Sequence, residues 1–348
     1  MPPSRPSRSG AFAPGRVNLI GEHTDYNRGL ALPFAIADGV TVRAEALPGE
    51  RMLIHARDLG EHDEFALGER SAAVGWRAFV RGTVAELSAA GFEPVGARVE
   101  IGADLPRGAG LSSSAALEVS LCLALLALGG HGEGALDRIA IARLCARVEN
   151  RWVGAHTGLL DQLASLCGEP QKALCIDFST LAIESVPLRL ERWRLAVLDS
   201  GERHAHAGSA YNQRRLECTR ACELLGITSL REASSEEAAA LPAPLDRRVR
   251  HVLSENQRVL RTVAALRAGD LAAVGDLMSA SHASLRDDYA ASTPRLEAAV
   301  ARLLDAGAAG ARMVGGGFGG SALGLFAPGA RPPENAREVR PSAGARLL

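Results

Sequence analysis

A glycine-rich turn that runs directly into a serine-rich helix start is the feature that most restricts how this chain can fold. The segment reads Leu-Pro-Arg-Gly-Ala-Gly-Leu-Ser-Ser-Ser-Ala-Ala-Leu-Glu over residues 105–118. Its continuation, Ala115 to Leu128, is the most apolar stretch of the sequence, although Glu118 and Ser120 interrupt it. This stretch is shorter than the roughly 20 apolar residues that span a bilayer. We therefore expect a buried helix with its N-terminus open to a loop of unpaired backbone amides.

The start of this helix is a predicted anion site. Gly108 and Gly110 lead into Ser112, Ser113 and Ser114, so backbone N–H groups and the positive end of the helix dipole converge on one point. Helix capping explains one serine, but hardly three serines that follow two glycines. A serine hydroxyl here could also ligate Mg²⁺, as the serine or threonine of a P-loop does.

Lysine is almost absent, and its absence excludes two classes of phosphate-handling enzyme. Of the 39 basic side chains, every one is arginine except Lys172. A P-loop ATPase needs G-x-x-x-x-G-K-[ST] and a protein kinase needs a lysine on a strand. The surroundings of Lys172, Glu-Pro-Gln-Lys-Ala-Leu, match neither pattern. If the chain handles phosphate, it must use backbone amides, arginine and a metal.

Charge and cysteine usage exclude further partners. The formal net charge of −1 does not suit nucleic-acid binding, which needs a concentrated basic face, so small molecules are the expected partners of a monomer or weak homo-oligomer. No apolar segment follows the basic N-terminus, which favours a cytoplasmic protein without a membrane segment. Cys218 and Cys222 could join His204 or His206 at a metal, but the six cysteines lack any C-x-x-C pair and free thiols are favoured.

The order of predicted elements suggests two domains, as a length of 348 residues also does on a prior of roughly 100–200 residues per domain. Alternating strands dominate residues 11–58, and helices dominate the chain after the composition shift near 185–195. We divide the chain into 11–190 and 191–348. Helices are predicted at 76–89, through most of 112–167, and at 207–225, 246–268, 271–285 and 294–306, with further strands at 97–101, 173–177, 193–199 and 322–326 and a loop at 234–244.

A dense polar set follows the first apolar strand. Glu22, His23, Asp25 and Asn27 crowd the end of the segment Gly-Arg-Val-Asn-Leu-Ile-Gly-Glu-His-Thr-Asp-Tyr-Asn. Each hydroxyl of a polyhydroxylated ligand both donates and accepts, so such a ligand would use this set well. The alternative is a polar turn capped by Asp25. A metal site is less favoured, because the spacing does not resemble H-E-x-x-H.

A carboxylate in an apolar segment marks a second candidate. Asp161 follows Leu159 and Leu160 in a stretch suited to burial, and a buried carboxylate must be paired or functional. Arg16 is the partner we expect. An aspartate beside an arginine stays ionised and can accept a proton from a substrate hydroxyl. A purely structural ion pair is the alternative.

The segment Gly315 to Gly320 formally satisfies G-x-G-x-x-G. A dinucleotide fingerprint must open a strand–helix–strand unit and be followed by an acidic residue about 20 positions on. Here a strand follows and the chain soon ends. Close approach of the backbone to a ligand or to the anion loop is the better interpretation.

Taken in order, these blocks resemble the galactokinase family, in the GHMP superfamily of small-molecule kinases that includes homoserine and mevalonate kinases. The likeness covers roughly residues 11–325. Residues 15–26 resemble the galactokinase signature, and Gly110-Leu-Ser-Ser-Ser-Ala and the glycine segment resemble the two further superfamily motifs. Similar stretches begin at Tyr211, Glu255 and Ser284.

The resemblance implies an α+β fold with an N-terminal domain like domain 2 of ribosomal protein S5 and a ferredoxin-like C-terminal α+β domain, with the active site between them. It implies transfer of the γ-phosphoryl group of ATP to the anomeric hydroxyl of α-D-galactose, with Mg²⁺. Asp161 would be the base and Arg16 its electrostatic partner. The sugar would be held by Glu22, His23, Asp25, Gly158 and Tyr211, the phosphates by Gly108, Ala109, Gly110, Leu111, Ser112, Ser113 and Ser114, and the metal by Ser113 or Ser114 with Glu149.

Some features leave the family pattern. The family usually places a helix and a final strand after the residue equivalent to Leu325, but here Pro328, Pro332 and Pro333 interrupt a short tail. We expect that the helix is lost, that the final strand is kept and that one edge of the second domain is thinly covered. Two alternatives remain: a kinase of another sugar such as arabinose or N-acetylgalactosamine, and a regulator that senses galactose and ATP without catalysis.

Overall fold

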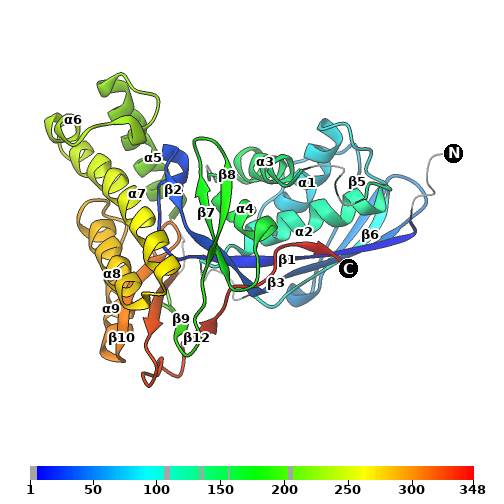
Figure 1. Cartoon of the computed structure of the whole chain (residues 1–348). Helices are drawn as coiled ribbons and strands as arrows, with labels where there is room; N and C mark the ends of the chain where they lie inside the picture. The colour runs from blue at the N-terminus through cyan, green and yellow to red at the C-terminus, as the bar shows by residue number, and fades with distance from the viewer. Residues whose placement is uncertain (1–5, 106–109, 133, 135–136, 156, 203–206) are drawn as a thin grey trace.

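The computed structural model consists of two layered parts joined side by side (Figure 1). It describes residues 6–105, 110–132, 134, 137–155, 157–202 and 207–348. Helices α1 to α4 cover a sheet at one end, and α5 to α9 accompany a second sheet at the other. No helix in the described ranges is long and apolar enough to cross a membrane.

The first sheet has the strand order β13-β1-β3-β6-β4-β5. Its pairs are antiparallel except for β4 with β6. In β3 the side chains of Val40, Val42 and Ala44 are buried in alternation, as expected for a strand with one covered face. The strands are β1 (Arg8–Asn18), β3 (Pro33–Ala46), β4 (Arg51–Ala56), β5 (Glu61–Ala66), β6 (Ala97–Ala103) and β13 (Arg346–Leu347).

Helix α2 is the centre of the first part, and the prediction of a buried helix is confirmed. It packs on β1 and β3 and against the other three helices of this part. Even Glu118 and Ser120 have no exposed surface. The helices are α1 (Trp76–Ala89), α2 (Ser113–Leu128), α3 (Arg138–Val148) and α4 (Leu160–Cys167), with a π-helical turn η3 (Glu149–Val153) after α3.

The second part is built on an antiparallel sheet of order β10-β11-β9-β12. Helices α8 and α9 pack on this sheet, and α7 packs against α5, α6 and α8. The elements are β9 (Arg194–Asp199), β10 (Ala308–Val314), β11 (Ser321–Phe326), β12 (Arg337–Val339), α5 (Ala207–Leu225), α6 (Ser235–Ala240), α7 (Leu245–Ala268), α8 (Leu271–Asp287) and α9 (Pro294–Asp305).

A third, small sheet of order β2-β7-β8 lies between the two parts (Figure 1). Its strands are β2 (Leu30–Ala31), β7 (Lys172–Asp177) and β8 (Ala182–Pro187). Short 3₁₀ turns complete the described elements: η1 (Asp25–Asn27), η2 (Arg57–Leu59) and η4 (Leu230–Glu232).

The predicted loop at 234–244 is wrong, and four strands of the structure were not predicted. Helix α6 lies within that range and begins at a capping box, in which Ser234 and Glu237 exchange side-chain to backbone hydrogen bonds. Such a pair stabilises even a short helix start. These strands are β5, β8, β10 and β12. In β5 and β8 only one residue each is fully buried, and β12 has three residues, so their hydrophobic signal was weak. Strand β10 is mostly buried and has Gly310 near its start.

The end of the chain returns to the first part. Residues 327–348 contain β12 and β13 and no helix, which confirms the predicted loss. Strand β12 is a three-residue edge of the second sheet, whereas β13 pairs with β1 through Ala11 and Phe12. The final strand therefore fastens the second part to the first, and the division at residue 190 stays a prediction.

Candidate functional site

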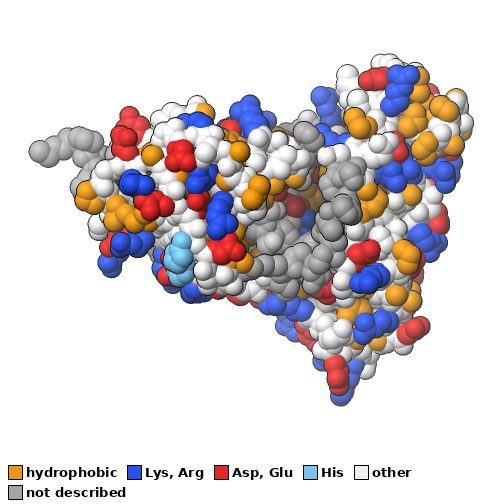
Figure 2. Space-filling view, turned by 180° about the vertical axis from the view of Figure 1, so that it is seen from behind, with side chains coloured by type: hydrophobic (Ala, Val, Ile, Leu, Met, Phe, Trp, Pro, Cys, Tyr) orange, Lys and Arg blue, Asp and Glu red, His pale blue; other side chains and the backbone are white. Residues whose placement is uncertain are grey.

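A cavity of about 380 Å³ brings the sequence motifs together. Figure 2 shows the molecule hollowed between its two parts. The cavity walls come from the end of β1, the start of α2, the connection between α3 and α4, the start of α5 and the glycine turn after β10. They include Arg16, Glu22, His23, Asp25, Gly110, Leu111, Ser112, Ser113, Ser114, Glu149, Gly158, Asp161 and Tyr211.

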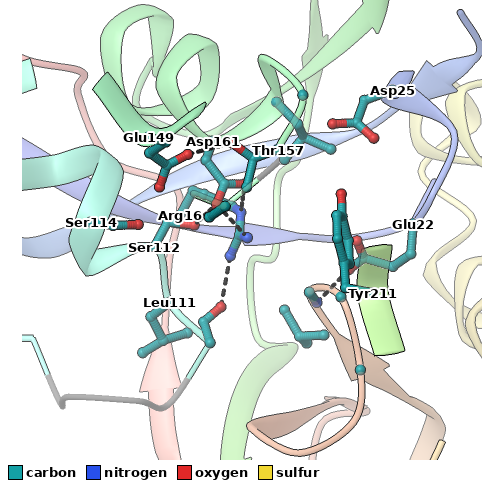
Figure 3. Close-up of a pocket in the computed structure, with 18 of the residues that line it drawn as sticks. Arg16, Glu22, Asp25, Leu111, Ser112, Ser114, Glu149, Thr157, Asp161 and Tyr211 are labelled. Atoms are coloured by element: carbon teal, nitrogen blue, oxygen red, sulfur yellow. Dashed lines mark hydrogen bonds and ion pairs between the residues drawn. The ribbon is translucent and has the colours of Figure 1, made fainter. Parts of the chain in front are cut away.

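The expected Arg16–Asp161 pair is present, 145 positions apart in sequence. Arg16 Nε donates to Asp161 Oδ1 at 2.7 Å and Nη2 donates to Oδ2 at 2.9 Å (Figure 3). Its remaining Nη1 donates to the carbonyl of Gly110 at 2.7 Å. Ser112 donates its hydroxyl to Asp161 Oδ2. Asp161 thus accepts three hydrogen bonds, and Arg16 joins it to the loop before α2.

Gly15 allows the loop to lie against β1. The strand pairing shifts register between Pro14 and Arg16, and the backbone N–H of Arg16 donates to the Leu111 carbonyl at 3.2 Å. A Cβ atom at Gly15 would stand 2.6 Å from that same oxygen, closer than real contacts allow. A glycine is therefore needed where the strand and the loop meet.

Ser112 does not cap α2. It is the residue before the helix and has a left-handed backbone with φ of 58°, and its side chain makes no capping hydrogen bond. The hydroxyl bonds Asp161 instead. The capping alternative therefore fails for this serine, because the structure uses it to fix a carboxylate.

Glu22 links the end of β1 to the glycine turn. Its Oε1 accepts from the Gly315 N–H at 2.7 Å and lies 3.5 Å from Arg312 Nη1. Burial raises the pKa of Glu22 above its usual value, and the charges of Arg312 and Arg16 oppose that rise.

Asp25 faces the cavity beside Gly158 and Tyr211 (Figure 3). A Cβ atom at Gly158 would stand 1.9 Å from Asp25 Oδ2, so any larger residue at this position would displace the carboxylate. Burial raises the pKa of Asp25 to about 6, with the negative charge of Asp161 adding to the rise. Asp25 and Asp161 thus face the same cavity.

His23 lines the cavity, but both of its ring nitrogens are engaged by the protein. Nδ1 lies 2.8 Å from the Tyr26 hydroxyl and Nε2 lies 3.1 Å from the Gly316 carbonyl. Burial lowers the pKa of His23 to about 3, so the ring is neutral near pH 7. A direct ring contact to a ligand would have to replace one of these bonds.

Glu149 heads an oxygen-rich cluster behind Asp161. Its Oε2 accepts from the Thr157 hydroxyl at 2.5 Å and from Gln162 Nε2 at 3.0 Å, and Ser114 also bonds its carboxylate. Burial raises the pKa of Glu149. Among the described residues, no group of three or more His, Cys, Asp or Glu side chains could hold a metal ion by itself.

Sequence reasoning missed some cavity residues and named others that cannot be placed. Asn212, next to Tyr211, lines the cavity, and its buried Oδ1 has no hydrogen-bond partner among the described residues. Its place in the family-like stretch that begins at Tyr211 was the available signal. Thr157 was missed because its role depends on Glu149. Gly108 and Ala109, and His204 and His206 of the alternative metal site, lie outside the described residues. Lys172 lies on β7 and pairs with Glu169.

Three family models match the chain. The galactokinase galactose-binding signature matches residues 4–45. The N-terminal domain of GHMP kinases matches residues 78–169 and the C-terminal model matches 262–345. Together they include the end of β1, the start of α2, Asp161 and the glycine turn, so the family models and the cavity select the same segments.

Whole-chain relatives agree with these models. The chain is 42% identical to the galactokinase of Mycobacterium tuberculosis over 345 residues, covering 94% of this chain and 90% of that protein. It is 41% identical to the galactokinase of Streptomyces coelicolor over 367 residues, covering 97% and 93%.

Solved structures extend the agreement to three dimensions. The crystal structure of Lactococcus lactis galactokinase complexed with galactose matches with a TM-score of 0.91 at 32% identity, over 99% of this chain and 96% of that one. Mevalonate kinase of L. major matches with a TM-score of 0.68 at 20% identity, over 99% and 100%, which shows a shared fold. The expected two-domain α+β fold is confirmed, and the chain belongs to the galactokinase family of GHMP kinases, which are ATP-dependent phosphotransferases.

Proposed function

We propose that this chain transfers the γ-phosphoryl group of ATP to the anomeric hydroxyl of α-D-galactose, giving galactose 1-phosphate and ADP. The observation that carries the proposal is the position of Asp161. Its carboxylate is held by Arg16 and Ser112 in a cavity that also contains the galactose-signature residues and the start of α2. Phosphoryl transfer needs alignment and charge neutralisation more than covalent chemistry from the protein, and this cavity offers both.

Asp161 Oδ1 is the proposed base atom. A carboxylate has about four lone-pair sites. Among the described residues, Oδ2 accepts from Arg16 Nη2 and from Ser112, whereas Oδ1 accepts only from Arg16 Nε. One site on Oδ1 therefore remains for the proton of the sugar hydroxyl. Arg16 would keep this oxygen aimed at the sugar and would place positive charge beside the transferred group.

The acceptor sugar would lie beside Asp25, Tyr211 and the Gly158 backbone, with Glu22 closing the far side. The sugar-binding roles of these residues and of His23 are supported by their position in one cavity. The polar set provides carboxylates, which accept, and a phenol, which donates or accepts, for a ring of hydroxyls.

The phosphates would lie at the start of α2, against Gly110, Leu111 and the serines that follow, where the helix dipole favours negative charge. The residues also fit Mg²⁺, because Ser114 and Glu149 present only oxygen atoms and Mg²⁺ typically takes one or two carboxylates plus substrate phosphates. Ser113 or Ser114 with Glu149 would hold the ion, which when bound would neutralise phosphate charge.

A coupled ADP-release assay tests the function. It should compare galactose, N-acetylgalactosamine, arabinose and mevalonate as acceptors, and ³¹P NMR of the product should show coupling to the anomeric proton. We expect the highest kcat/KM with galactose. Preference for another sugar would favour the related sugar 1-kinase, and binding of galactose without ADP release from any acceptor would favour the sensing regulator.

Asp25→Asn tests the proposed sugar site. It is expected to weaken galactose binding and to make the fold more stable at neutral pH. The folded-state pKa of Asp25 is about 6, above its ordinary value of 3.8, so its ionisation weakens the fold as pH rises through that window. The variant should therefore have a higher Tm than the wild type at pH 7.5 and a similar Tm near pH 4. Loss of charge-assisted hydrogen bonds should raise the galactose KM by about 10- to 100-fold.

Calorimetry without sugar and initial-rate kinetics measure the two effects. Asp276→Asn makes the same chemical change at an exposed position on α8 and should alter neither quantity. An unchanged galactose KM in Asp25→Asn would remove this carboxylate from the sugar site.

A further inference from the structure

All three tyrosines of this chain gather around one histidine. The ring of His23 lies 4.5 Å from Tyr289, 5.5 Å from Tyr211 and 5.9 Å from Tyr26, centroid to centroid. Tyr211 lines the cavity, whereas Tyr26 and Tyr289 stand behind it. Tyr26 and Tyr289 are not among the residues that line the cavity, so their hydroxyls need another explanation.

The hydroxyls belong to a continuous series of hydrogen bonds that starts at His23. Its Nδ1 lies 2.8 Å from the Tyr26 oxygen, which lies 2.8 Å from the Tyr289 oxygen. The Tyr289 oxygen lies 3.1 Å from Cys218 Sγ. Asn27 Nδ2 contacts that sulfur at 3.6 Å and donates to the His23 carbonyl at 2.8 Å. The series therefore begins and ends at residue 23.

Its two ends fix the direction of every proton. The Gly316 carbonyl can only accept, so His23 Nε2 must carry the hydrogen that it receives. In the neutral ring Nδ1 is then an acceptor, and Tyr26 must donate to it. Tyr26 in turn accepts from Tyr289. The Asn27 amide can only donate at the other end.

The remaining link agrees with this direction. Since Asn27 donates to the sulfur, the Cys218 thiol donates to the Tyr289 oxygen. Burial raises the pKa of Cys218 to about 11, so the thiol keeps its proton. Every group of the series can therefore be neutral, and each hydrogen bond has one donor and one acceptor without conflict.

We propose that His23, Tyr26, Tyr289 and Cys218 form one directional hydrogen-bond chain that holds the glycine turn in place beside the acceptor sugar. This inference rests on the proposed function. Tyr26 and Tyr289 are positioning residues, and the ring of His23 serves the sugar site through the Gly316 carbonyl. Any contact of the sugar with His23 then uses its backbone or its ring carbons.

The glycine turn needs such an anchor. Gly315 and Gly317 have φ of 79° and 75°, and glycines impose little conformational preference by themselves. The segment after β1 makes two hydrogen bonds to the turn. Glu22 accepts from the Gly315 N–H, and His23 Nε2 donates to the Gly316 carbonyl. A Cβ at Gly316 would lie 2.9 Å from the ring of Tyr211, so a shift of the turn would displace a proposed sugar residue.

Initial-rate kinetics of variants that each remove one side-chain polar group test the hydrogen-bond chain. Tyr26→Phe removes the donor to Nδ1 and should raise the galactose KM by about 5- to 10-fold, the size of one neutral hydrogen bond, while the ATP KM changes less than about twofold. Tyr289→Phe and Cys218→Ala act one and two links away and should have successively smaller effects. Cys222 lies one helical turn after Cys218 and is not part of the hydrogen-bond chain. Cys222→Ala is therefore the matched control and should behave as the wild type.

The histidine tautomer gives a readout that does not require catalysis. In two-bond ¹⁵N spectra of histidine-labelled protein, His23 should be a neutral Nε2–H tautomer at pH 7, and Tyr26→Phe should shift its Nδ1 resonance while Cys222→Ala should not. An Nδ1–H tautomer, a protonated ring at pH 7 or an equal KM in all four variants would overturn the proposal. If the wild-type protein fails to phosphorylate galactose, the proposed function is wrong. The hydrogen-bond chain would still be supported if His23 has the expected tautomer and Tyr26→Phe shifts its Nδ1 resonance.

Discussion

Asp161→Asn is expected to lower kcat by about 10³-fold, the usual range for loss of a general base. An amide oxygen can still accept from Arg16, but the amide carries no charge and cannot take the proton of a sugar hydroxyl. Its NH₂ group would also face the Arg16 guanidinium in either orientation, and the Ser112 hydroxyl too when it replaces Oδ2, where the carboxylate accepts. The side chain has the same size, so the fold should persist.

Single-turnover kinetics with ATP and galactose measure this effect on the chemical step, and calorimetric titration with galactose confirms that the sugar site survives. Ser112→Ala is the matched variant, because it removes one donor to the same carboxylate and keeps the base. It should lower kcat by about tenfold or less. Turnover like that of the wild type in Asp161→Asn would refute the base assignment, whatever the result for Ser112→Ala.

The pair at the centre of this site could be predicted because an apolar sequence context leaves a carboxylate few options. Asp161 follows two leucines, so the sequence predicted a buried carboxylate that needs a cation, and Arg16 in the polar signature was available. In the structure the pair forms, but Asp161 is only partly buried and faces the cavity. Helix α1 also has the predicted bounds, Trp76–Ala89, since its apolar periodicity is regular. The apolar context of Asp161 and the periodicity of α1 can both be recognised from neighbouring residues, and the packing in the folded chain agrees with them.

Other roles depend on contacts that a sequence does not display. Ser112 occupies a position suited to phosphate binding or capping, yet its hydroxyl is directed to a carboxylate 49 positions away. Tyr26, Cys218 and Tyr289 come from three distant segments, and each is an ordinary core residue by itself. Only the folded chain shows that their polar atoms form one series.

The scarcity of lysine acquires a structural meaning in the cavity. Among the described residues that line it, Arg16 is the only lysine or arginine. Within the described part of the chain, the start of α2 also offers positive potential to the proposed phosphate site, because a helix dipole is equivalent to roughly half an elementary charge at the N-terminus. Among the described lining residues, one side chain therefore carries the positive charge, and its replacement should have a large effect.

Arg16→Lys is expected to lower kcat by about 100-fold or more even though the charge is kept. The guanidinium makes three directed bonds, two to Asp161 and one to the Gly110 carbonyl, and a lysine ammonium cannot reproduce that planar fork. The arginine side chain is 7% exposed and the aspartate 28%. Leaving the carbonyl and part of the carboxylate without donors should also destabilise the fold by about 1–3 kcal/mol.

Arg8→Lys is the matched control, because it makes the same change on the same strand. Arg8 pairs with Glu45 at the surface, where its side chain is 78% exposed, and such pairs contribute about 0–1 kcal/mol. Its kcat and Tm should equal those of the wild type within error. If Arg16→Lys raises the galactose KM but leaves kcat intact, Arg16 acts in sugar binding and not at the reacting phosphoryl group, because loss of a transition-state contact must appear in kcat.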